Sequence, residues 1–280
     1  MSSNPSSPPP AVAVTRPEED EAGEDRLSEL LRREGMRPLS FPLMALAPPM
    51  SLGALNAAAR RLVGAVQGGG ALPYAWIVIT SRNVIPPFLD AVGRAGGSPE
   101  ALQGAGLHVA TVGQATATAL EGAGLPADLV PSRYTAEDLL ETLRERGGIG
   151  EGSRILLPRA EVARDVLPEG IRELGGHVDV VTAYRVVEDC EGAEALCQAV
   201  RQERLQGVTL TSGRAARLLG ATWAAAGGGG AWPRTVRVVV IGPVTAEATR
   251  KAGLRVDGIP EEATLPALAR AMARTLGVGE

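Results

Sequence analysis

A segment of 23 residues occurs twice in this chain, and this internal repeat restricts the possible fold more than any other feature of the sequence. Without a gap, ten of the 23 positions are identical between residues 113–135 and 242–264, which share the frame Gly-x-x-Thr-Ala, Ala-Gly-Leu, Asp, Pro and Thr. A second matching pair lies upstream of each copy, IVITSRN at 77–83 and VTLTSGR at 208–214. Repetition of this kind predicts two units that are built in the same way.

The order of the repeated parts predicts that one unit interrupts the other. A third, weaker pair, VAVTRPE at 12–18 and ILLPRAE at 155–161, places an arginine and an acid after an apolar run. We therefore expect a discontinuous domain formed by both ends of the chain, with a continuous domain inserted into it. The predicted division is a disordered tail at 1–10, the discontinuous domain at 11–47 plus 186–280, and the inserted domain at 48–185.

Short apolar runs alternate with helix-like segments, such as 136–146 and 265–276, along the whole length of the chain. This alternation is typical of parallel α/β units. Aromatic residues make up only 3% of the chain, so we expect cores of Val, Leu, Ile and Ala around buried parallel strands. The predicted fold class is α/β, with two doubly wound parallel-sheet domains. The expected strands are 11–14, 75–80, 107–112, 154–158, 177–184, 207–211 and 236–242.

Composition and motif content argue against several classes of function. The formal net charge is −4 and no basic stripe is visible, which argues against a nucleic-acid binder. No apolar run approaches the roughly 18–20 residues of a membrane span, and the Ser/Pro-rich start does not resemble a signal peptide. The frames G-x-G-x-x-G and G-x-x-x-x-G-K-[ST] do not occur, which disfavours NAD and ATP chemistry. We expect a soluble cytoplasmic protein with no nucleic-acid partner and no membrane association.

The few residues that could bind a metal or form a Schiff base show no pattern for such chemistry. The single lysine, Lys251, is expected to be a solvated side chain on a helix. Cys190 and Cys197 match no zinc spacing and are expected to pack in or near one helix. His108 and His177 each follow a turn with glycine and are expected at strand edges. We expect no metal site.

Small polar residues and glycines follow four of the expected strands and precede a helix. In doubly wound sheets this is the carboxyl edge, where ligands bind. Helix N-termini there offer unpaired N–H groups and a partial positive charge, so two such rims would suit a ligand with many carboxylates. Alternatively, each Ser or Thr is an ordinary helix N-cap. The candidate binding residues in these turns are Thr80, Ser81, Gly113, Thr116, Ser212, Gly242 and Thr245.

One arginine and one tyrosine complete the candidate site. Arg16 follows the first expected strand, and a guanidinium binds a carboxylate in a fork while keeping its charge. Alternatively, Arg16 is only a solvated charge on a surface turn. Tyr184 ends the run HVDVVTAY at an expected crossing between the domains, where its phenol could donate a proton to a leaving oxygen. The alternative for Tyr184 is packing against the crossing segment.

Six stretches, taken in order, carry a family resemblance over most of the chain, from about Ala11 to Leu276. They are VAVTRP (12–17), VITSRNV (78–84), VATVGQATATALEGAG (109–124), LLPRAEVARDVLPEGIRELGGHVDVVTAYRV (156–186), LTSGRAARLL (210–219) and VIGPVTAEATRKAGL (240–254). Together they resemble the uroporphyrinogen-III synthase family. The resemblance implies two α/β domains joined by a two-stranded linker, with both chain ends in one domain, and it implies an enzyme without metal or organic cofactor.

The implied reaction converts hydroxymethylbilane, an octacarboxylate chain of four pyrroles, into uroporphyrinogen III. Loss of the terminal hydroxyl gives an azafulvene, a spiro intermediate forms, and reclosure inverts the last ring. By motif position, Tyr184 corresponds to the family's cleft tyrosine, which assists departure of the hydroxyl. Thr116 and Thr245 correspond to its cleft threonines, and Ser81 and Ser212 to its Thr-Ser turns at the substrate carboxylates. Because the bilane closes spontaneously to the uninverted isomer, we expect a lyase that acts mainly by positioning.

Two other functions remain compatible with the sequence. The chain could be a catalytically inactive module that senses a tetrapyrrole or another polycarboxylate. It could also be a two-lobed sugar- or amino-acid-binding protein of the periplasmic kind, although the absence of a signal peptide argues against this. For the leading function we expect a monomer, and the preceding enzyme of the pathway is a candidate protein partner.

Overall fold

The computed structural model describes residues 8–17, 26–146, 148–226 and 231–278. Contacts within the chain divide it into two compact units. The terminal unit comprises Met1–Ala45 with Val187–Glu280, and the inserted unit comprises Leu46–Val186. The disordered tail expected at 1–10 lies mostly outside the described residues. That each of the two predicted domains folds independently stays a prediction.

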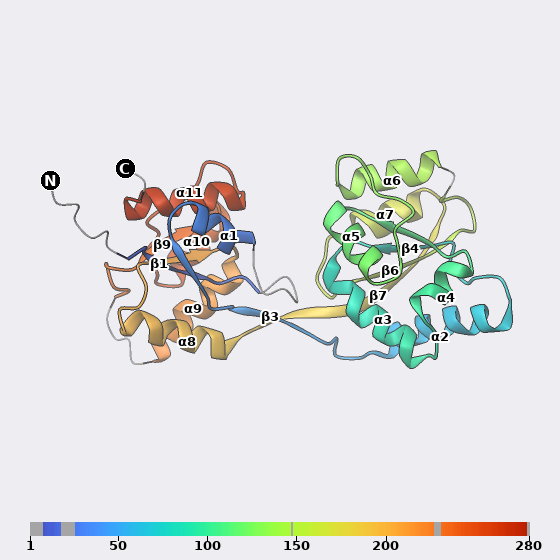
Figure 1. Cartoon of the computed structure of the whole chain (residues 1–280), viewed down its shortest axis with the longest axis horizontal. Coiled ribbons are helices and arrows are strands. Elements are labelled where there is room, and N and C mark those ends of the chain that lie inside the picture. The colour runs from blue at the N-terminus through green and yellow to red at the C-terminus, as the bar shows by residue number, and fades with distance from the viewer. Residues whose placement is uncertain (1–7, 18–25, 147, 227–230, 279–280) are drawn as a thin grey trace. The chain divides into compact units, whose positions relative to one another are not determined.

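The terminal unit contains a parallel sheet with helices on both faces (Figure 1). From edge to edge its strands are β2 (Arg37–Ser40), β1 (Ala11–Val14), β8 (Gly207–Leu210) and β9 (Arg237–Val240). Its helices are α1 (Arg26–Arg33), α8 (Cys190–Arg201), α9 (Gly213–Ala225), α10 (Pro243–Lys251) and α11 (Leu265–Leu276). Successive side chains of a strand point to opposite faces. Ala11 and Ala13 of β1 therefore pack with α8, α9 and α10. Val12 and Val14 pack with α1 and α11.

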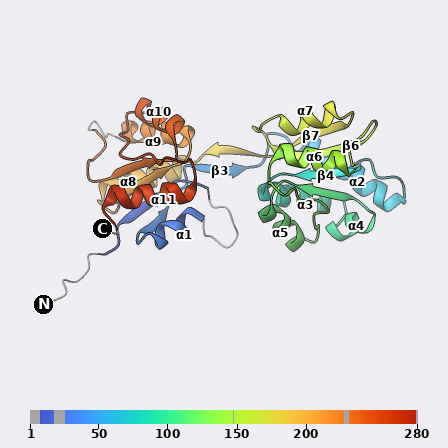
Figure 2. The same ribbon diagram turned by 90° about the horizontal axis from the view of Figure 1, so that it is seen from above.

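The inserted unit repeats this construction (Figure 2). From edge to edge its strands are β3 (Met44–Ala47), β7 (His177–Glu188), β6 (Arg154–Ala160), β4 (Trp76–Ile79) and β5 (His108–Thr111). Its helices are α2 (Gly53–Gly68), the short 3₁₀ turn η1 (Arg82–Val84), α3 (Ile85–Arg94), α4 (Pro99–Gly104), α5 (Gln114–Gly122), α6 (Ala136–Glu145) and α7 (Val166–Glu173). Ile77 and Ile79 of β4 pack with α2, α3, α4 and α5, whereas Val78 packs with α6 and α7. The pairs β4–β5, β4–β6 and β6–β7 are parallel, so the predicted parallel α/β fold class is confirmed.

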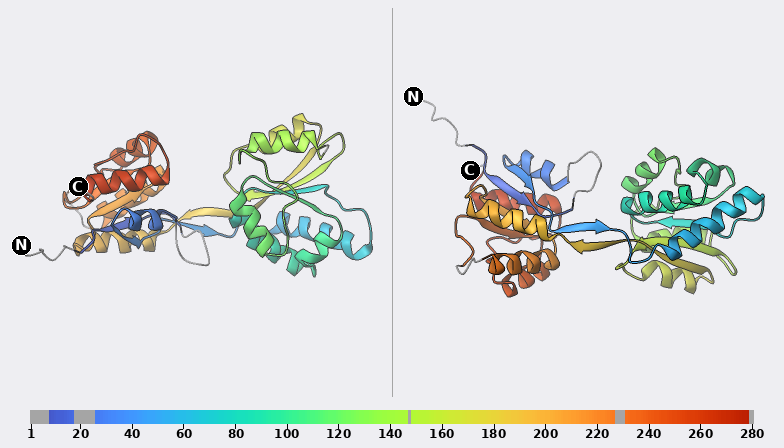
Figure 3. Two further views of the ribbon diagram at one scale, coloured as in Figure 1. Left: turned by 45° about the horizontal axis from the view of Figure 1, so that its top comes forward. Right: turned by 90° about the horizontal axis from the view of Figure 1, so that it is seen from below.

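Strands β3 and β7 carry the chain between the units. The division falls inside both strands, after Ala45 in β3 and after Val186 in β7. The two strands are hydrogen-bonded neighbours and lie side by side in both views of Figure 3. The two crossings are thus made by paired strands.

The sequence repeat marks equivalent structural positions in the two units. Gly124 and Gly253 end α5 and α10 in a left-handed conformation, with φ of 76° and 79°. Asp128 Oδ2 then accepts a hydrogen bond of 2.7 Å from a backbone N–H of β5, and Asp257 Oδ2 accepts one of 2.9 Å from β9. The repeated residues therefore end a helix and attach the following segment to the edge of the sheet.

Some expectations about single elements and residues need correction. Strands β2 and β3 are absent from the expected set. The expectation that both cysteines pack is right for buried Cys197 and wrong for Cys190, which is exposed in the first turn of α8. Within the described residues, no helix is both long and apolar enough to cross a membrane.

Candidate active site

The candidate residues lie where the parallel strands of each sheet have their carboxyl ends. In each sheet two neighbouring strands lead to next strands that lie on opposite sides of the pair. In the terminal unit β1 leads to β2 and β8 leads to β9, and in the inserted unit β6 leads to β7 and β4 leads to β5. Such a switch point leaves a crevice at the carboxyl edge, where ligands of open α/β sheets bind. The terminal unit carries Arg16, Ser212, Gly242 and Thr245, and the inserted unit carries Thr80, Ser81, Gly113, Thr116 and Tyr184.

Gly113 and Gly242 are the N-cap residues of α5 and α10. Their φ angles of −140° and −176° are extended, so the backbone does not require glycine at either place. A Cβ atom on Gly113 would meet nothing within 4 Å, and one on Gly242 would meet only the Ala263 Cβ at 3.6 Å. Packing does not require glycine either. Because glycine has no side chain, the two helix N-termini are open to a ligand. Such a ligand can accept hydrogen bonds from the backbone N–H groups there.

Thr116 and Thr245 are the third residues of these two helices and are only 7% and 6% exposed. Among the described residues, neither side-chain hydroxyl has a hydrogen-bond partner. Neither hydroxyl oxygen is among the fully buried side-chain atoms that lack a partner in the described residues, so both oxygens stay accessible to solvent. The same feature at equivalent places in both units indicates hydroxyls that are available to a ligand.

The two serines behave as helix caps. Ser81 Oγ accepts from the Asn83 N–H at 3.3 Å, and Ser212 Oγ accepts from the Ala215 N–H at 3.1 Å. Both serine hydroxyls are therefore ordinary helix N-caps. A ligand at these turns would instead bind to neighbouring backbone N–H groups. Thr80 is half-buried directly after β4.

Arg16 lies directly beyond the switch point of the terminal unit and is partly buried. Two threonine hydroxyls join the strands there, because Thr15 Oγ1 donates to the Thr209 carbonyl at 2.7 Å and Thr209 Oγ1 donates to the Ala13 carbonyl at 3.0 Å. In the inserted unit the equivalent Arg159 is occupied by its own turn, since it pairs with Asp165 at 2.7 Å. Arg16 stays a candidate for a substrate carboxylate because of its place directly beyond the switch point.

Tyr184 lies in β7 opposite Ala160, the last residue of β6, where the pairing shifts register. Its carbonyl accepts from the Glu161 N–H at 2.9 Å, which fixes the backbone at the carboxyl edge. The side chain is partly exposed and packs on the core that lies under α2 and α3. Tyr184 thus lies at the same carboxyl edge of the inserted sheet as Gly113 and Thr116. It also packs against apolar residues, as the alternative to a catalytic role requires.

A separate polar cluster lies at the amino edge of the inserted sheet. Tyr74 Oη donates to Asp179 Oδ2 at 2.7 Å, and Arg154 pairs with the same carboxylate at 3.1 Å. Burial and the bond to Asp179 raise the pKa of Tyr74. Burial disfavours the charged form of Asp179, but the bond from Tyr74 and the charge of Arg154 outweigh it and lower the pKa of this carboxyl. A cavity of about 580 Å³ beside this cluster is lined by Arg154, Arg172, His177 and Asp179, among others. This cavity contains none of the predicted site residues.

Sequence reasoning missed one exposed side chain at the carboxyl edge of the inserted unit. Tyr134 is 56% exposed in the loop before α6, with a positive φ of 56°. Neither property follows from residue spacing. Across the described residues, no group of three His, Cys, Asp or Glu side chains is arranged to hold a metal ion.

The family model of uroporphyrinogen-III synthase HemD matches residues 25–270. The chain belongs to this family. The uroporphyrinogen-III synthase of Synechococcus elongatus is 26% identical over 247 residues, which cover 85% of this chain and 86% of that protein. A putative uroporphyrinogen-III synthase of Methanothermobacter thermautotrophicus is 32% identical over 184 residues, covering 60% of this chain and 67% of the relative. The porphyrin biosynthesis protein HemD of Ruminiclostridium josui is 28% identical over 245 residues; the match covers 87% of this chain and only 44% of that protein.

Solved structures show the same fold. A uroporphyrinogen III synthase mutant from Thermus thermophilus matches with a TM-score of 0.50 at 20% identity, over 95% of this chain and 98% of that one. The uroporphyrinogen-III synthetase of Helicobacter pylori matches with a TM-score of 0.51 at 12% identity, over 96% and 99%. Family and relatives together indicate a uroporphyrinogen-III synthase, a lyase of haem biosynthesis, so the predicted family and enzyme class are confirmed. The sensor alternative has no support among these matches.

Proposed function

We propose that this chain converts hydroxymethylbilane into uroporphyrinogen III with loss of one water. The observation that carries this proposal is the pair of equivalent helix N-termini at Gly113 and Gly242. Each has a glycine that neither backbone nor packing requires, followed by a nearly buried threonine whose hydroxyl lacks a partner among the described residues. Two such turns in a member of this family suit a substrate with eight carboxylates.

The proposed catalysis is mainly positioning. Backbone N–H groups at the turns of Ser81, Gly113, Ser212 and Gly242 bind substrate carboxylates, and Arg16 adds a fixed positive charge. Thr80, Thr116 and Thr245 add hydroxyl contacts. Holding the bilane in one folded shape favours attack by the substituted carbon of the last ring, and about 1.4 kcal/mol of preference gives tenfold selectivity.

Tyr184 is proposed to assist the first chemical step. Its phenol donates a hydrogen bond or proton to the terminal hydroxyl of the bilane, so that this group leaves as water and the azafulvene forms. No cofactor is needed for this step, because the pyrrole nitrogen lone pair expels the leaving group.

An isomer-resolved assay tests the proposal directly. Purified protein with hydroxymethylbilane and no added cofactor should yield uroporphyrinogen III, separated by chromatography after oxidation to the porphyrin. Tyr184→Phe should lower kcat by about 10²-fold with the type III isomer still formed. Tyr74→Phe, which changes the tyrosine of the amino-edge cluster, is the matched control and should leave kcat unchanged. Formation of the type I isomer alone by the wild type would overturn the proposal.

The remaining expectations about location and assembly stay part of the proposal. We propose a cytoplasmic monomer without a nucleic-acid or membrane partner, which receives its unstable substrate from the preceding enzyme. Light scattering of the purified protein tests the monomer, and substrate-transfer kinetics with the preceding enzyme test the partnership.

A further inference from the structure

Tyr134 has a backbone conformation that is unusual for its residue type. Among the described residues, Tyr134 and Glu203 are the only ones other than glycine with a positive φ, 56° and 55°. The left-handed region is disfavoured for residues with a Cβ atom. Such outliers persist where the surrounding structure holds them, and they cluster at functional sites.

The conformation of Glu203 has an ordinary explanation, and that of Tyr134 does not. Glu203 ends α8, where its N–H bonds to the Val200 carbonyl at 3.1 Å and the Arg204 N–H bonds to the Ala199 carbonyl at 3.0 Å. Helices commonly end through one left-handed residue in this way. Tyr134 precedes a helix instead, because Thr135 is the N-cap of α6.

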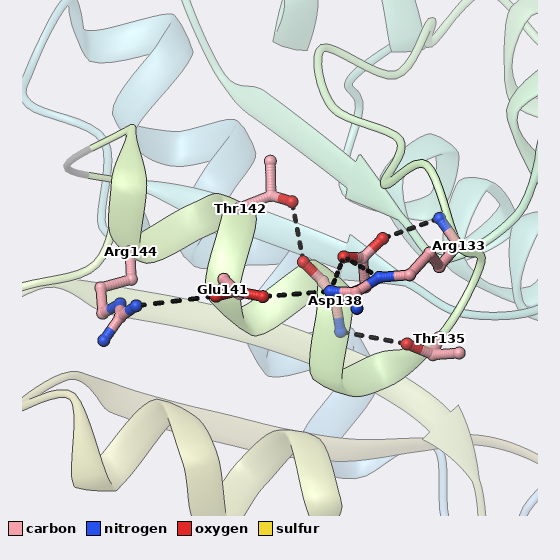
Figure 4. A network of polar contacts seen from close by, with 6 residues as sticks. All are labelled: Arg133, Thr135, Asp138, Glu141, Thr142 and Arg144. Carbon is pink, nitrogen blue, oxygen red and sulfur yellow. Dashed lines mark hydrogen bonds and ion pairs between the residues drawn. The ribbon is translucent and has the colours of Figure 1, made fainter.

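The neighbours of Tyr134 hold it in place through Asp138 (Figure 4). On one side, the Arg133 N–H donates to Asp138 Oδ2 at 2.7 Å, and Arg133 Nε and Nη2 donate to Oδ1 at 2.9 and 2.7 Å. On the other side, Thr135 Oγ1 accepts from the Asp138 N–H at 3.1 Å. Asp138 is only 6% exposed. Tyr134 therefore lies between Arg133, which binds the Asp138 carboxylate, and Thr135, which accepts from the Asp138 backbone N–H, while its own side chain stays 56% exposed.

Tyr134 lies at the same edge as the candidate site. Leu129 pairs in parallel with Ala110, and the Thr111 N–H donates to the Leu129 carbonyl at 3.0 Å. The segment after Leu129 therefore emerges at the carboxyl edge of the inserted sheet, where Gly113 also lies.

The terminal unit shows that the turn itself does not need this tyrosine. In the gap-free repeat the counterpart of Tyr134 is Ala263, which also stands directly before a threonine N-cap, Thr264. Ala263 has no positive φ. A large aromatic ring in a disfavoured conformation is thus added to the inserted unit alone.

We propose that Tyr134 is a substrate-contact residue whose ring stacks on one pyrrole ring of the tetrapyrrole. This inference rests on the proposed function and adds an aromatic contact to the carboxylate contacts described above. Aromatic rings favour offset stacking or edge-to-face contact with other π systems, and a ring on a fixed backbone restricts which pyrrole lies there. Tyr134 therefore helps to hold the bilane in one folded shape before ring closure.

The test separates the ring from the backbone conformation. Tyr134→Phe keeps the ring, Tyr134→Ala removes the ring and keeps the disfavoured φ, and Tyr134→Gly removes both. We expect Tyr134→Ala and Tyr134→Gly to raise KM for hydroxymethylbilane, and Kd for uroporphyrinogen III kept reduced under argon, by about tenfold. Tyr134→Phe should stay within about twofold of the wild type. Tyr134→Gly should also raise Tm by about 2–4 °C, because glycine adopts a positive φ freely.

Glu203→Gly is the matched control, since it relieves the same φ at the amino edge of the terminal unit. It should raise Tm and leave KM and Kd unchanged. Wild-type KM and Kd in Tyr134→Gly would overturn the role of Tyr134 and leave the proposed function standing. A wild type that binds uroporphyrinogen III but forms no type III isomer would overturn the proposed function, and the Kd of the variants would still decide the role of Tyr134. A wild type that neither turns over nor binds would overturn both.

Discussion

At the scale of single residues, Gly113 and Gly242 allow a direct test of ligand binding, because neither the backbone conformation nor the packing requires glycine there. Replacement of either by Ala should lower the free energy of unfolding by less than about 1 kcal/mol. We expect kcat/KM to fall about tenfold or more, because the new methyl group occupies the open approach to a helix N-terminus. The measurement is steady-state kinetics alongside chemical denaturation.

Gly150→Ala is the matched control for these two variants. A Cβ atom at Gly150 also meets nothing within 4 Å, but this residue lies before β6, at the amino edge. Its kinetics should equal those of the wild type. Unchanged kcat/KM in both Gly113→Ala and Gly242→Ala would show that no ligand approaches these turns.

The two cysteines should differ in reactivity. Burial raises the pKa of Cys197 to about 11, whereas Cys190 is exposed. At pH 8 only about a thousandth of Cys197 is thiolate, which is the reactive form. A disulfide reagent should therefore titrate one thiol per native chain and two after denaturation. Cys190→Ser should leave no reactive thiol in the native protein; fast labelling of that variant would contradict the buried position of Cys197.

Residue type and spacing predicted part of the candidate site. The two Gly-x-x-Thr turns were recognisable because the same residues recur at the same distance after an apolar run. Two properties were not recognisable. The capping role of Ser81 and Ser212 depends on side-chain rotamers, and the exposure of Tyr134 depends on a backbone angle that tertiary contacts impose.

At the scale of elements, the start of α6 depends on one ionised carboxyl group. Hydrogen bonds from the Arg133 side chain and backbone, which outweigh partial desolvation, lower the pKa of Asp138. A carboxyl group with a lowered folded-state pKa stabilises the fold above its unfolded-state pKa, about 3.9, and this contribution is lost as the pH falls through the folded-state value. Asp138→Asn should therefore lower Tm at pH 7, and the difference from the wild type should shrink below about pH 4.

Glu247→Gln provides the comparison for Asp138→Asn. Its bond to Lys251 also lowers the pKa of Glu247, but both side chains are exposed on α10. Exposed pairs of this kind contribute little to stability, so Tm should hardly change at any pH. Parallel Tm curves for wild type and Asp138→Asn over the whole pH range would contradict the proposed anchoring of α6.

The sequence pattern identified the central strands and missed the two short ones at the sheet edges for a physical reason. The central strands are apolar on both faces, as parallel strands between helix layers must be. Strand β2 reads Arg-Pro-Leu-Ser and has no such run. Its extended conformation comes from pairing, since the Arg37 N–H donates to the Pro10 carbonyl and the Phe41 N–H donates to the Val14 carbonyl, both at 2.9 Å. Tertiary contacts of this kind leave no local signal.

At the scale of the whole molecule, the two units should differ in whether they fold as fragments. Both core clusters of the inserted unit consist only of residues from within it. A fragment of residues 46–186 should therefore unfold cooperatively in urea when followed by circular dichroism. A fragment of residues 187–280 should not, because β8 loses its partner β1. Non-cooperative unfolding of the first fragment would contradict the predicted inserted domain.

The interrupted terminal unit also sets the order of events on the ribosome. Ala11 and its hydrogen-bond partner Gln206 are 195 residues apart in the chain, whereas only η1, α3 and α4 lie between the paired strands β4 and β5. At roughly 5–20 residues per second, β1 waits about 10–40 s for that partner to be synthesised. During this time β2 and α1 are available to β1, but its four apolar residues lack their buried contacts with β8 and the later helices. The nascent chain can thus complete its middle while its beginning is still unfinished, and a chaperone that shields the first strand would act in that interval.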